Sequence, residues 1–219
     1  MASPRDYKNT IVPNWCPGCG DYGIQNAISA VCAKKGWANE DITLISGIGC
    51  SSRIGGYQYC YGAHTTHGRA LPFAQGIKCA NKDQHMIVCS GDGDSYAIGL
   101  GHAMHAIKRN MDITYLVFDN QVYGLTKGQT SPVSEKGFVT KTTPDGNPLT
   151  PLDAPAMALA AGATFVAQAY AIDSKTMIDV IERAVDHKGF SYVNIFTTAF
   201  TDASYLAPGL VISSTFLIS

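Results

Sequence analysis

The feature that most constrains this chain is a recurring order of short apolar run, turn and amphipathic segment. Three apolar runs, at 42–46, 85–90 and 113–120, have the length and composition of buried strands. Each run ends at a turn that carries glycine or asparagine. Short apolar strands of this kind, separated by helical segments, predict a parallel α/β sheet that is covered by helices on both faces.

Helical spacing of apolar residues accompanies these runs. It is found over 22–35, where Asp21 is the expected N-cap, and again over 70–80 and 96–108. In the second half of the chain, residues 126–153 are rich in Gly, Pro, Ser and Thr, which predicts a long loop over a site. Further elements are expected as a helix near 154–161, a strand near 164–168, a helix over 174–188 and a strand over 191–196. Residues 1–219 are therefore expected to form a single domain.

Composition limits the classes of function. Lys plus Arg number 16 and Asp plus Glu 17, so the chain has no basic surface for nucleic acid or anionic membrane. Charged residues make up 15% of the chain, against roughly 25% in an average soluble domain, which indicates that part of the surface lies against a partner. Seven cysteines and a start without an apolar signal segment favour a cytoplasmic protein with reduced thiols. The apolar run 206–218 is too interrupted to span a bilayer and is expected to form a strand or an irregular tail.

Three turns are expected to meet at one ligand. GIGCSS (47–52), GDGD (91–94) and DNQVYG (119–124) each follow a predicted strand, and ligands of parallel sheets bind beyond the carboxyl ends of the strands. Glycines in GDGD let backbone N–H groups approach a phosphate. Asp92 and Asn120 stand at neighbouring strand ends and offer the oxygen ligands that Mg²⁺ accepts. The pattern predicts a Mg²⁺–diphosphate cofactor.

Cys16 and Cys19 form a CxxC turn just before the first helix. Such a turn can be a redox pair, half of a zinc site or half of an iron–sulfur site. The residue order differs from that of a thioredoxin, and the chain has no second CxxC to complete a zinc site. Cys50 lies in GIGCSS, beside the expected cofactor, and is the candidate third thiolate.

Five ordered segments resemble the β subunit of 2-oxoacid:ferredoxin oxidoreductases, from about residue 12 to about residue 196. They read WCPGCG, SGIGCSSRI, HTTHGRALPFAQGIK, SGDGDSYAIGLGH and FDNQVYGLTKGQTSP. The resemblance implies a thiamin diphosphate-binding fold in which Mg²⁺ is held by Asp92, Asn120 and the Val122 carbonyl. It implies that Cys16, Cys19 and Cys50 ligate a [4Fe–4S] cluster. The residues implied to surround the diphosphate are Ile48, Gly49, Cys50, Ser51, His67, Gly91, Asp92, Gly93, Asp94, Asn120, Val122, Leu125 and Thr126.

The chain departs from the family after the last predicted strand. Relatives carry a fourth cluster cysteine there, whereas this chain reads FTTAFTDASYLAPG, and residues 197–219 look divergent. Cys60 is one candidate for the fourth ligand. The oxygen donors near this point are Thr197, Thr198 and Asp202, and oxygen is a poorer ligand than thiolate for cluster iron.

The resemblance implies a subunit that acts with an α partner. Its enzyme would decarboxylate a 2-oxoacid, of 2-oxoglutarate or broad type, to an acyl-CoA and CO₂ with ferredoxin as the electron acceptor. Arg53 is a candidate contact for a distal substrate carboxylate. Two alternatives remain open: a non-oxidative thiamin-dependent decarboxylase subunit, and a degenerate subunit that binds a partner without chemistry.

Overall fold

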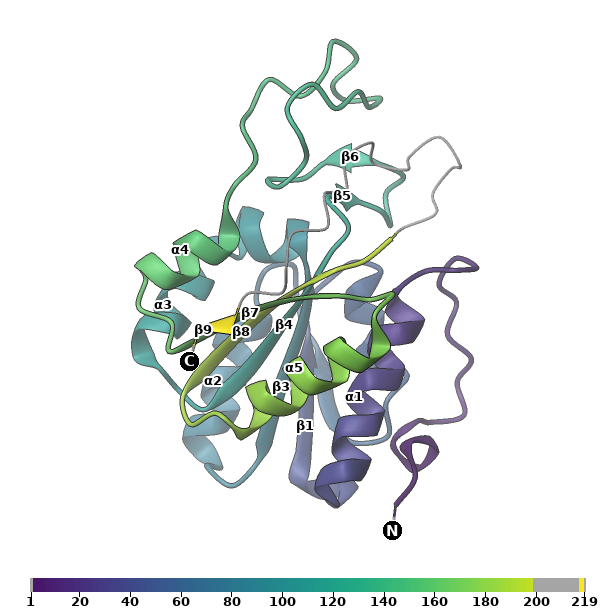
Figure 1. The fold of residues 1–219 in the computed structure, drawn as a ribbon, viewed down its shortest axis with the longest axis vertical. Helices are drawn as coiled ribbons and strands as arrows, with labels where there is room; N and C mark the ends of the chain where they lie inside the picture. The colour runs from purple at the N-terminus through teal and green to yellow at the C-terminus, as the bar shows by residue number, and fades with distance from the viewer. Residues whose placement is uncertain (1, 199–216, 219) are drawn as a thin grey trace.

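A computed structural model of the chain describes residues 2–198 and 217–218. Its centre is a seven-stranded sheet in the order β2-β1-β3-β4-β8-β7-β9, in which all neighbours are parallel except β7 and β9. A separate antiparallel hairpin, β5–β6, stands beyond the carboxyl end of β4 (Figure 1). The strands are β1 (Ile42–Ser46), β2 (Tyr61–His64), β3 (His85–Gly91), β4 (Ile113–Asp119), β5 (Val122–Tyr123), β6 (Gln129–Thr130), β7 (Phe165–Tyr170), β8 (Phe190–Phe196) and β9 (Leu217–Ile218).

Helices cover both faces of the sheet (Figure 1). They are α1 (Asp21–Lys35), α2 (Ala70–Ala80), α3 (Leu100–Arg109), α4 (Ala154–Ala160) and α5 (Ser174–Asp186). Buried residues of α1 and α5 share one apolar cluster with the sheet, and those of α2, α3 and α4 share the other. Every residue of β1 and β4 is buried, as expected for strands covered on both faces. The predicted parallel α/β sheet is confirmed.

Some predicted helix and strand boundaries match the structure to the residue, and others differ from it. The strand over 42–46 and the helix over 70–80 are β1 and α2. The helix expected over 96–108 is instead a π-helical turn, Asp94–Ile98, followed by α3. Asp21 was expected to cap α1 but is its first residue, because Gly20 occupies the cap position and the Asp21 side chain is buried.

The edge strand β2 was not predicted. Three of its four residues are exposed, so it has neither the apolar run nor the alternation by which strands are found in a sequence. The structure defines it through its parallel pairing with β1. Of the apolar run 206–218, only 217–218 belong to the described residues, and they form β9. No helix within the described ranges is long and apolar enough to cross a membrane.

Candidate cofactor site

A pocket lies beyond the carboxyl ends of β1, β3 and β4, where the three predicted turns meet. All thirteen residues implied to surround the diphosphate line it. Of the long loop 126–153, the pocket lining includes only Thr126. Five further residues line it: Tyr123 and Gly124 of the predicted DNQVYG turn, Thr197, which was predicted only as an oxygen donor near the cluster, and Asp21 and Phe118, which were not predicted as site residues. The sequence therefore located the pocket through its turns and did not predict that the Asp21 side chain, from the first helix, also reaches it.

Glycine at two positions allows the turns to approach one another. A Cβ on Gly93 would lie 2.3 Å from the Tyr123 ring, and a Cβ on Gly47 would lie 1.8 Å from Asp94 Oδ2. Neither position leaves room for a side chain without moving its neighbour. The Tyr123 hydroxyl donates to the Gly93 carbonyl at 3.2 Å, so Tyr123 packs directly on the GDGD turn.

Asp92 carries a buried carboxylate oxygen that lacks a protein partner. Oδ2 is inaccessible to solvent and has no hydrogen-bond partner. Burial, and secondly the negative charge of Asp119, raise the pKa of Asp92 well above its ordinary value. A bound cation would lower the pKa of Asp92 again, because its positive charge stabilises the carboxylate and the free oxygen becomes its ligand. The geometry of Asp92 thus fits a metal ligand.

The Asn120 side chain forms a hydrogen bond within its own turn. Asn120 Oδ1 accepts from the Val122 N–H at 3.1 Å, and Asp119 Oδ1 accepts from the Gln121 N–H at 3.2 Å. Gln121 has a positive φ of 61°, a left-handed conformation that is uncommon outside glycine. These contacts hold the turn in a conformation that places Asn120 and Val122 in the pocket lining.

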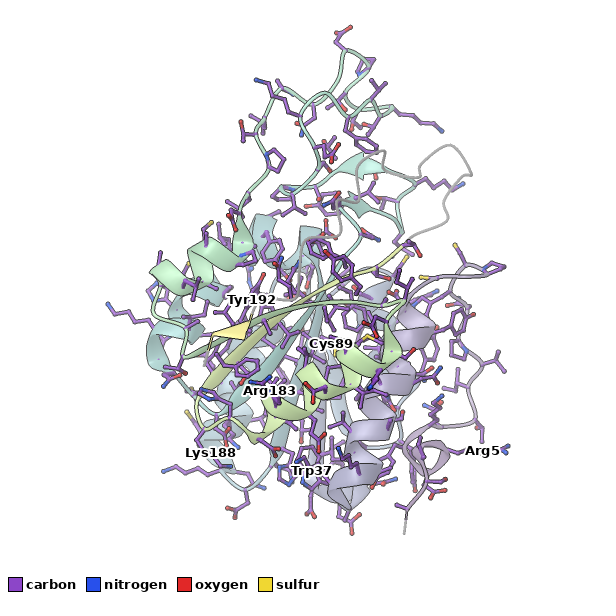
Figure 2. The ribbon with its side chains drawn as sticks, viewed as in Figure 1. Arg5, Trp37, Cys89, Arg183, Lys188 and Tyr192 are labelled. Atoms are coloured by element: carbon purple, nitrogen blue, oxygen red, sulfur yellow. The ribbon has the colours of Figure 1, made fainter. Side chains whose placement is uncertain are left out.

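A buried polar network supports this turn from inside the sheet. Asn194 Nδ2 donates to Asp119 Oδ2 at 2.9 Å, and the Tyr96 hydroxyl donates to Asn194 Oδ1 at 2.7 Å. The Tyr192 hydroxyl, whose side chain is labelled in Figure 2, lies 2.5 Å from that of Tyr96. Burial raises the pKa of Asp119 to about 6. The network connects β8 and the π-helical turn to the end of β4.

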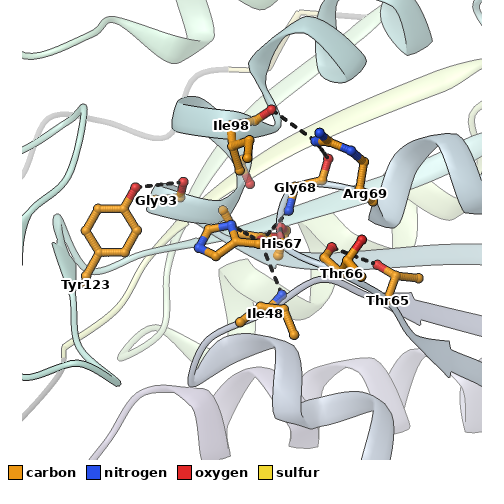
Figure 3. Close-up of polar contacts among 12 residues, drawn as sticks. Ile48, Thr65, Thr66, His67, Gly68, Arg69, Gly93, Ile98 and Tyr123 are labelled. Carbon is orange, nitrogen blue, oxygen red and sulfur yellow. Dashed lines mark hydrogen bonds and ion pairs between the residues drawn. The ribbon is translucent and has the colours of Figure 1, made fainter.

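Asp94 is enclosed by groups from three segments of the chain. Its Oδ1 accepts from the backbone N–H groups of Ile48 at 3.2 Å and Gly68 at 2.7 Å, and its Oδ2 accepts from the Ser90 hydroxyl. His67 Nδ1 lies 2.8 Å from Oδ1 (Figure 3). The carboxylate is 1% exposed, whereas the His67 side chain is 39% exposed and lines the pocket.

Of the three predicted cluster cysteines, Cys50 lines the pocket, and Cys16 and Cys19 interact with it electrostatically. The charges of Cys16 and Cys50 act on Cys19, and burial raises the pKa of the Cys19 thiol to about 12. Trp15 Nε1 donates to the Cys50 carbonyl at 2.7 Å and so ties the CxxC segment to the turn after β1. In the ranges that the structure describes, no group of three or more His, Cys, Asp or Glu side chains is arranged to hold a metal ion.

Asp21 lines the pocket, and its side chain also interacts with the Cys19 thiol. Burial raises its pKa to about 7, and the neighbouring Cys19 and Thr197 side chains partly oppose that rise. The position was interpreted from the sequence as a helix cap, because Asp commonly begins helices. An acidic residue two positions after the CxxC turn was the available signal for a site residue, and it also fits a cap.

Two predicted residues lie elsewhere. Arg53 is not among the pocket-lining residues, and its Nη1 donates to Asn14 Oδ1 at 2.6 Å. Burial raises the pKa of the Cys32 and Cys89 thiols, and the nearby Cys60, the candidate fourth cluster ligand, adds to that rise. Figure 2 shows Cys89 in the interior of the fold. Asp202 lies outside the described residues.

Comparison with known proteins agrees with this geometry. Residues 47–195 match the thiamine pyrophosphate enzyme family, C-terminal TPP binding domain. The chain is 43% identical to the 2-oxoglutarate synthase subunit KorB of Archaeoglobus fulgidus, over 90% of this chain and 74% of that protein. It is 44% identical to the 2-oxoglutarate oxidoreductase subunit KorB of Mycobacterium tuberculosis, over 92% of this chain and 54% of the relative.

The chain belongs to the β subunits of 2-oxoacid:ferredoxin oxidoreductases.

A solved structure of this family has the same fold. The 2-oxoglutarate:ferredoxin oxidoreductase from Magnetococcus marinus, with 2-oxoglutarate, coenzyme A and succinyl-CoA bound, aligns with a TM-score of 0.90 at 44% identity. The alignment covers 91% of this chain and 69% of that one. The resemblance noted in the sequence and the thiamin diphosphate-binding fold expected from it are therefore confirmed.

This chain spans only part of the length of the relatives it matches. It spans 54% of the Mycobacterium relative and 60% of the 2-oxoacid:ferredoxin oxidoreductase subunit beta of Saccharolobus solfataricus. The family match over 47–195 includes the three turns of the pocket and excludes Cys16 and Cys19.

Proposed function

We propose that this chain is the thiamin diphosphate- and Mg²⁺-binding β subunit of an enzyme that oxidatively decarboxylates a 2-oxoacid to an acyl-CoA and CO₂. Ferredoxin is the proposed electron acceptor. The observation that carries the proposal is the pocket at three strand ends, in which a buried Asp92 oxygen has no protein partner. Thiamin diphosphate supplies, when bound, the carbanion that attacks the keto carbon of such a substrate.

In this proposal, the protein binds and orients the cofactor. Asp92, Asn120 and the Val122 carbonyl would hold Mg²⁺, a set of oxygen ligands that suits this ion. Backbone N–H groups of the GDGD turn, at the start of the helical segment 94–98, would face the phosphates. Ile48 and Leu125 add apolar surface to the pocket lining, which would reduce access of water to the reacting atoms.

We propose 2-oxoglutarate as the first substrate to test, because the Magnetococcus marinus structure contains it together with coenzyme A and succinyl-CoA. In the structure, the Arg53 guanidinium donates to Asn14, and Arg53 does not line the pocket. We therefore propose Arg53 as a substrate contact that requires its guanidinium to leave Asn14. A direct comparison of 2-oxoglutarate with pyruvate in the Arg53→Ile variant tests this contact. An unchanged preference would contradict it.

Cys16, Cys19 and Cys50 remain our proposed cluster ligands because their thiols interact electrostatically with one another and Cys50 lines the pocket. Three thiols do not complete the ligand set of a [4Fe–4S] cluster, and in the described part of the chain the fourth ligand is not identified. The residues therefore fit the cluster incompletely, and we derive no electron-transfer step through it.

An α subunit is the proposed partner, in the cytoplasm. Ile98 and Leu125 are 56% and 49% exposed, and both belong to segments that form or adjoin the pocket. Large apolar side chains beside a binding site are typical of surfaces that a partner covers. A partner that covers Ile98 and Leu125 would also enclose the pocket.

Reconstitution tests the proposed activity. The chain would be combined with its α subunit, thiamin diphosphate, Mg²⁺, coenzyme A and 2-oxoglutarate, and reduction of ferredoxin would be followed by absorbance. We expect reduction that requires every component. Release of CO₂ without ferredoxin reduction would indicate the non-oxidative decarboxylase instead, and absence of both products would indicate a subunit without chemistry.

A further inference from the structure

The turn that carries two of the proposed Mg²⁺ ligands contains a residue in an unfavourable backbone conformation. Gln121 lies between Asn120 and Val122, which both line the pocket. It has a positive φ of 61°, and a residue with a Cβ adopts this left-handed conformation only where its surroundings hold it there. The direction in which Asn120 and Val122 face therefore depends on what holds Gln121.

Both backbone polar groups of Gln121 are hydrogen-bonded to side chains. Its N–H donates to Asp119 Oδ1 at 3.2 Å, and its carbonyl accepts from the Ser134 hydroxyl at 2.5 Å. Ser134 Oγ in turn accepts from the Ser131 N–H at 2.8 Å. Gln121 is thus held on one side by the end of β4 and on the other by the long loop 126–153.

The Asp119 carboxylate has a second partner that keeps its Oδ1 on Gln121. Its other oxygen, Oδ2, accepts from Asn194 Nδ2 on β8 at 2.9 Å. Asp119 is 4% exposed and Asn194 is 1% exposed, so water has little access to replace either partner. Without the Asn194 amide, the carboxylate would turn toward other donors, because a buried polar group without a hydrogen bond is costly. Asn194 therefore determines the orientation of the group that holds Gln121.

Two buried tyrosines determine which way the Asn194 amide faces. The Tyr96 hydroxyl donates to Asn194 Oδ1 at 2.7 Å. The Tyr192 hydroxyl lies 2.5 Å from that of Tyr96 and 3.4 Å from Asn194 Oδ1. A hydroxyl has a single hydrogen, and Tyr96 gives its hydrogen to Asn194, so Tyr192 is the donor in the contact between the two hydroxyls. The amide oxygen is thereby kept on the tyrosines and the amide nitrogen on Asp119.

We propose that Asn194 is a positioning residue for the Mg²⁺ site and acts through Asp119. Its amide holds the Asp119 carboxylate, and the carboxylate holds Gln121 in the left-handed conformation. This conformation directs Asn120 and Val122 to a common metal ion. Asn194 is not among the described residues that line the pocket, so it contributes no ligand itself. The inference rests on the proposed function for the identity of the ion, whereas the hold on Gln121 does not depend on it.

Amide hydrogen exchange in the cofactor-free full chain tests this hold. Asn194→Leu replaces the amide by an apolar group of similar size, and Tyr96→Phe removes only the hydroxyl that orients the amide. We expect the Gln121 amide to exchange about ten-fold faster in Asn194→Leu, with a smaller increase in Tyr96→Phe, and each increase should exceed that of the Val117 amide inside β4. Unchanged exchange at Gln121 would overturn the proposal, as would an equal acceleration at Gln121 and Val117, which indicates only a general loss of stability.

Tyr115→Phe is a matched control. Tyr115 is also a buried tyrosine, and its hydroxyl donates to Ser95 Oγ at 2.7 Å, outside the series of contacts that ends at Gln121. This variant should lose a buried hydrogen bond without changing the exchange of Gln121 relative to Val117. Thermal melting of each variant shows whether the fold is kept, and Tyr96→Phe carries the test if Asn194→Leu does not fold.

The dependence on Mg²⁺ separates displaced metal ligands from a collapsed pocket. Binding of thiamin diphosphate would be measured by calorimetric titration at a series of Mg²⁺ concentrations. Because Asp92 and Asn120 are still present, we expect Asn194→Leu to need about ten-fold more Mg²⁺ for half-maximal binding and to recover wild-type affinity at saturating Mg²⁺. Tyr115→Phe should follow the wild type. A loss that high Mg²⁺ does not restore, or an unchanged Mg²⁺ requirement, would overturn the proposal.

Failure of the wild type to bind thiamin diphosphate with Mg²⁺ would contradict the proposed function instead. The exchange measurements would still decide whether Asn194 holds Gln121, since they need neither ligand. The two failures are therefore distinguishable.

Discussion

Asp21 is buried among groups that do not neutralise it. The pKa of about 7 reflects mainly its removal from water, and an unfolded chain would return it to about 3.9. Because the folded pKa is raised, the neutral carboxyl favours folding at low pH. That contribution is complete below about pH 4 and is lost as the pH rises towards and through 7.

Replacing Asp21 by Asn should therefore reduce the pH dependence of the free energy of unfolding of the metal-free chain. We expect the variant to exceed the wild type in free energy of unfolding at pH 8 by on the order of 3 kcal/mol, with a much smaller difference at pH 5. Urea unfolding at both pH values measures this difference. Asp145→Asn changes an exposed aspartate and should alter neither value, and an equal gain for Asp21→Asn at both pH values would contradict the burial argument.

At the scale of elements, the sequence was most informative where an element has a recognisable pattern of its own. β1 and α2 were predicted to the residue, since the strand is a short apolar run and the helix has apolar residues at helical spacing. β2 could not be predicted because its position depends on pairing with β1 rather than on its own pattern. The π-helical turn was also missed, because it depends on contacts around Asp94 that are distant in sequence.

The pairing of β2 with β1 provides a test at this scale. A Cβ on Gly62 would lie 2.5 Å from the Leu44 carbonyl oxygen, so Gly62→Ala should destabilise the chain by about 2 kcal/mol. Gly76 in α2 has nothing within 4 Å of its would-be Cβ, and Gly76→Ala should instead stabilise by up to about 1 kcal/mol. Thermal unfolding distinguishes the two, and a neutral Gly62→Ala would contradict the close approach of the strands.

At the scale of the whole molecule, the site was predicted from turns and completed by tertiary structure. The spacing of Asp92 and Asn120 on successive strand ends indicated a shared ligand, and the structure brings both to one pocket. Asp21, Tyr123 and Thr197 reach the same pocket from a helix, a hairpin and the end of β8. Their side-chain directions follow from packing, which the sequence pattern does not specify.

The cluster assignment is a separate question at this scale. With three thiols, we expect anaerobically purified chain to contain fewer than four irons per chain and to lose them readily to a chelator. Cys50→Ser should lower the iron content further, whereas Cys79→Ser, which changes an exposed cysteine on α2, should not. Iron and sulfide analysis decides this, and a stable stoichiometric [4Fe–4S] cluster would show that a fourth ligand exists.

The most direct test of the proposed cofactor pocket is calorimetric titration of thiamin diphosphate into the full chain with Mg²⁺ present. We expect the wild type and the exposed-site control Asp145→Asn to bind alike, and Asp92→Ala to lose binding by at least about a hundred-fold, because it removes the carboxylate proposed for the metal. Circular dichroism would confirm that the variant keeps its fold. Equal affinity in Asp92→Ala and the wild type would contradict the assignment.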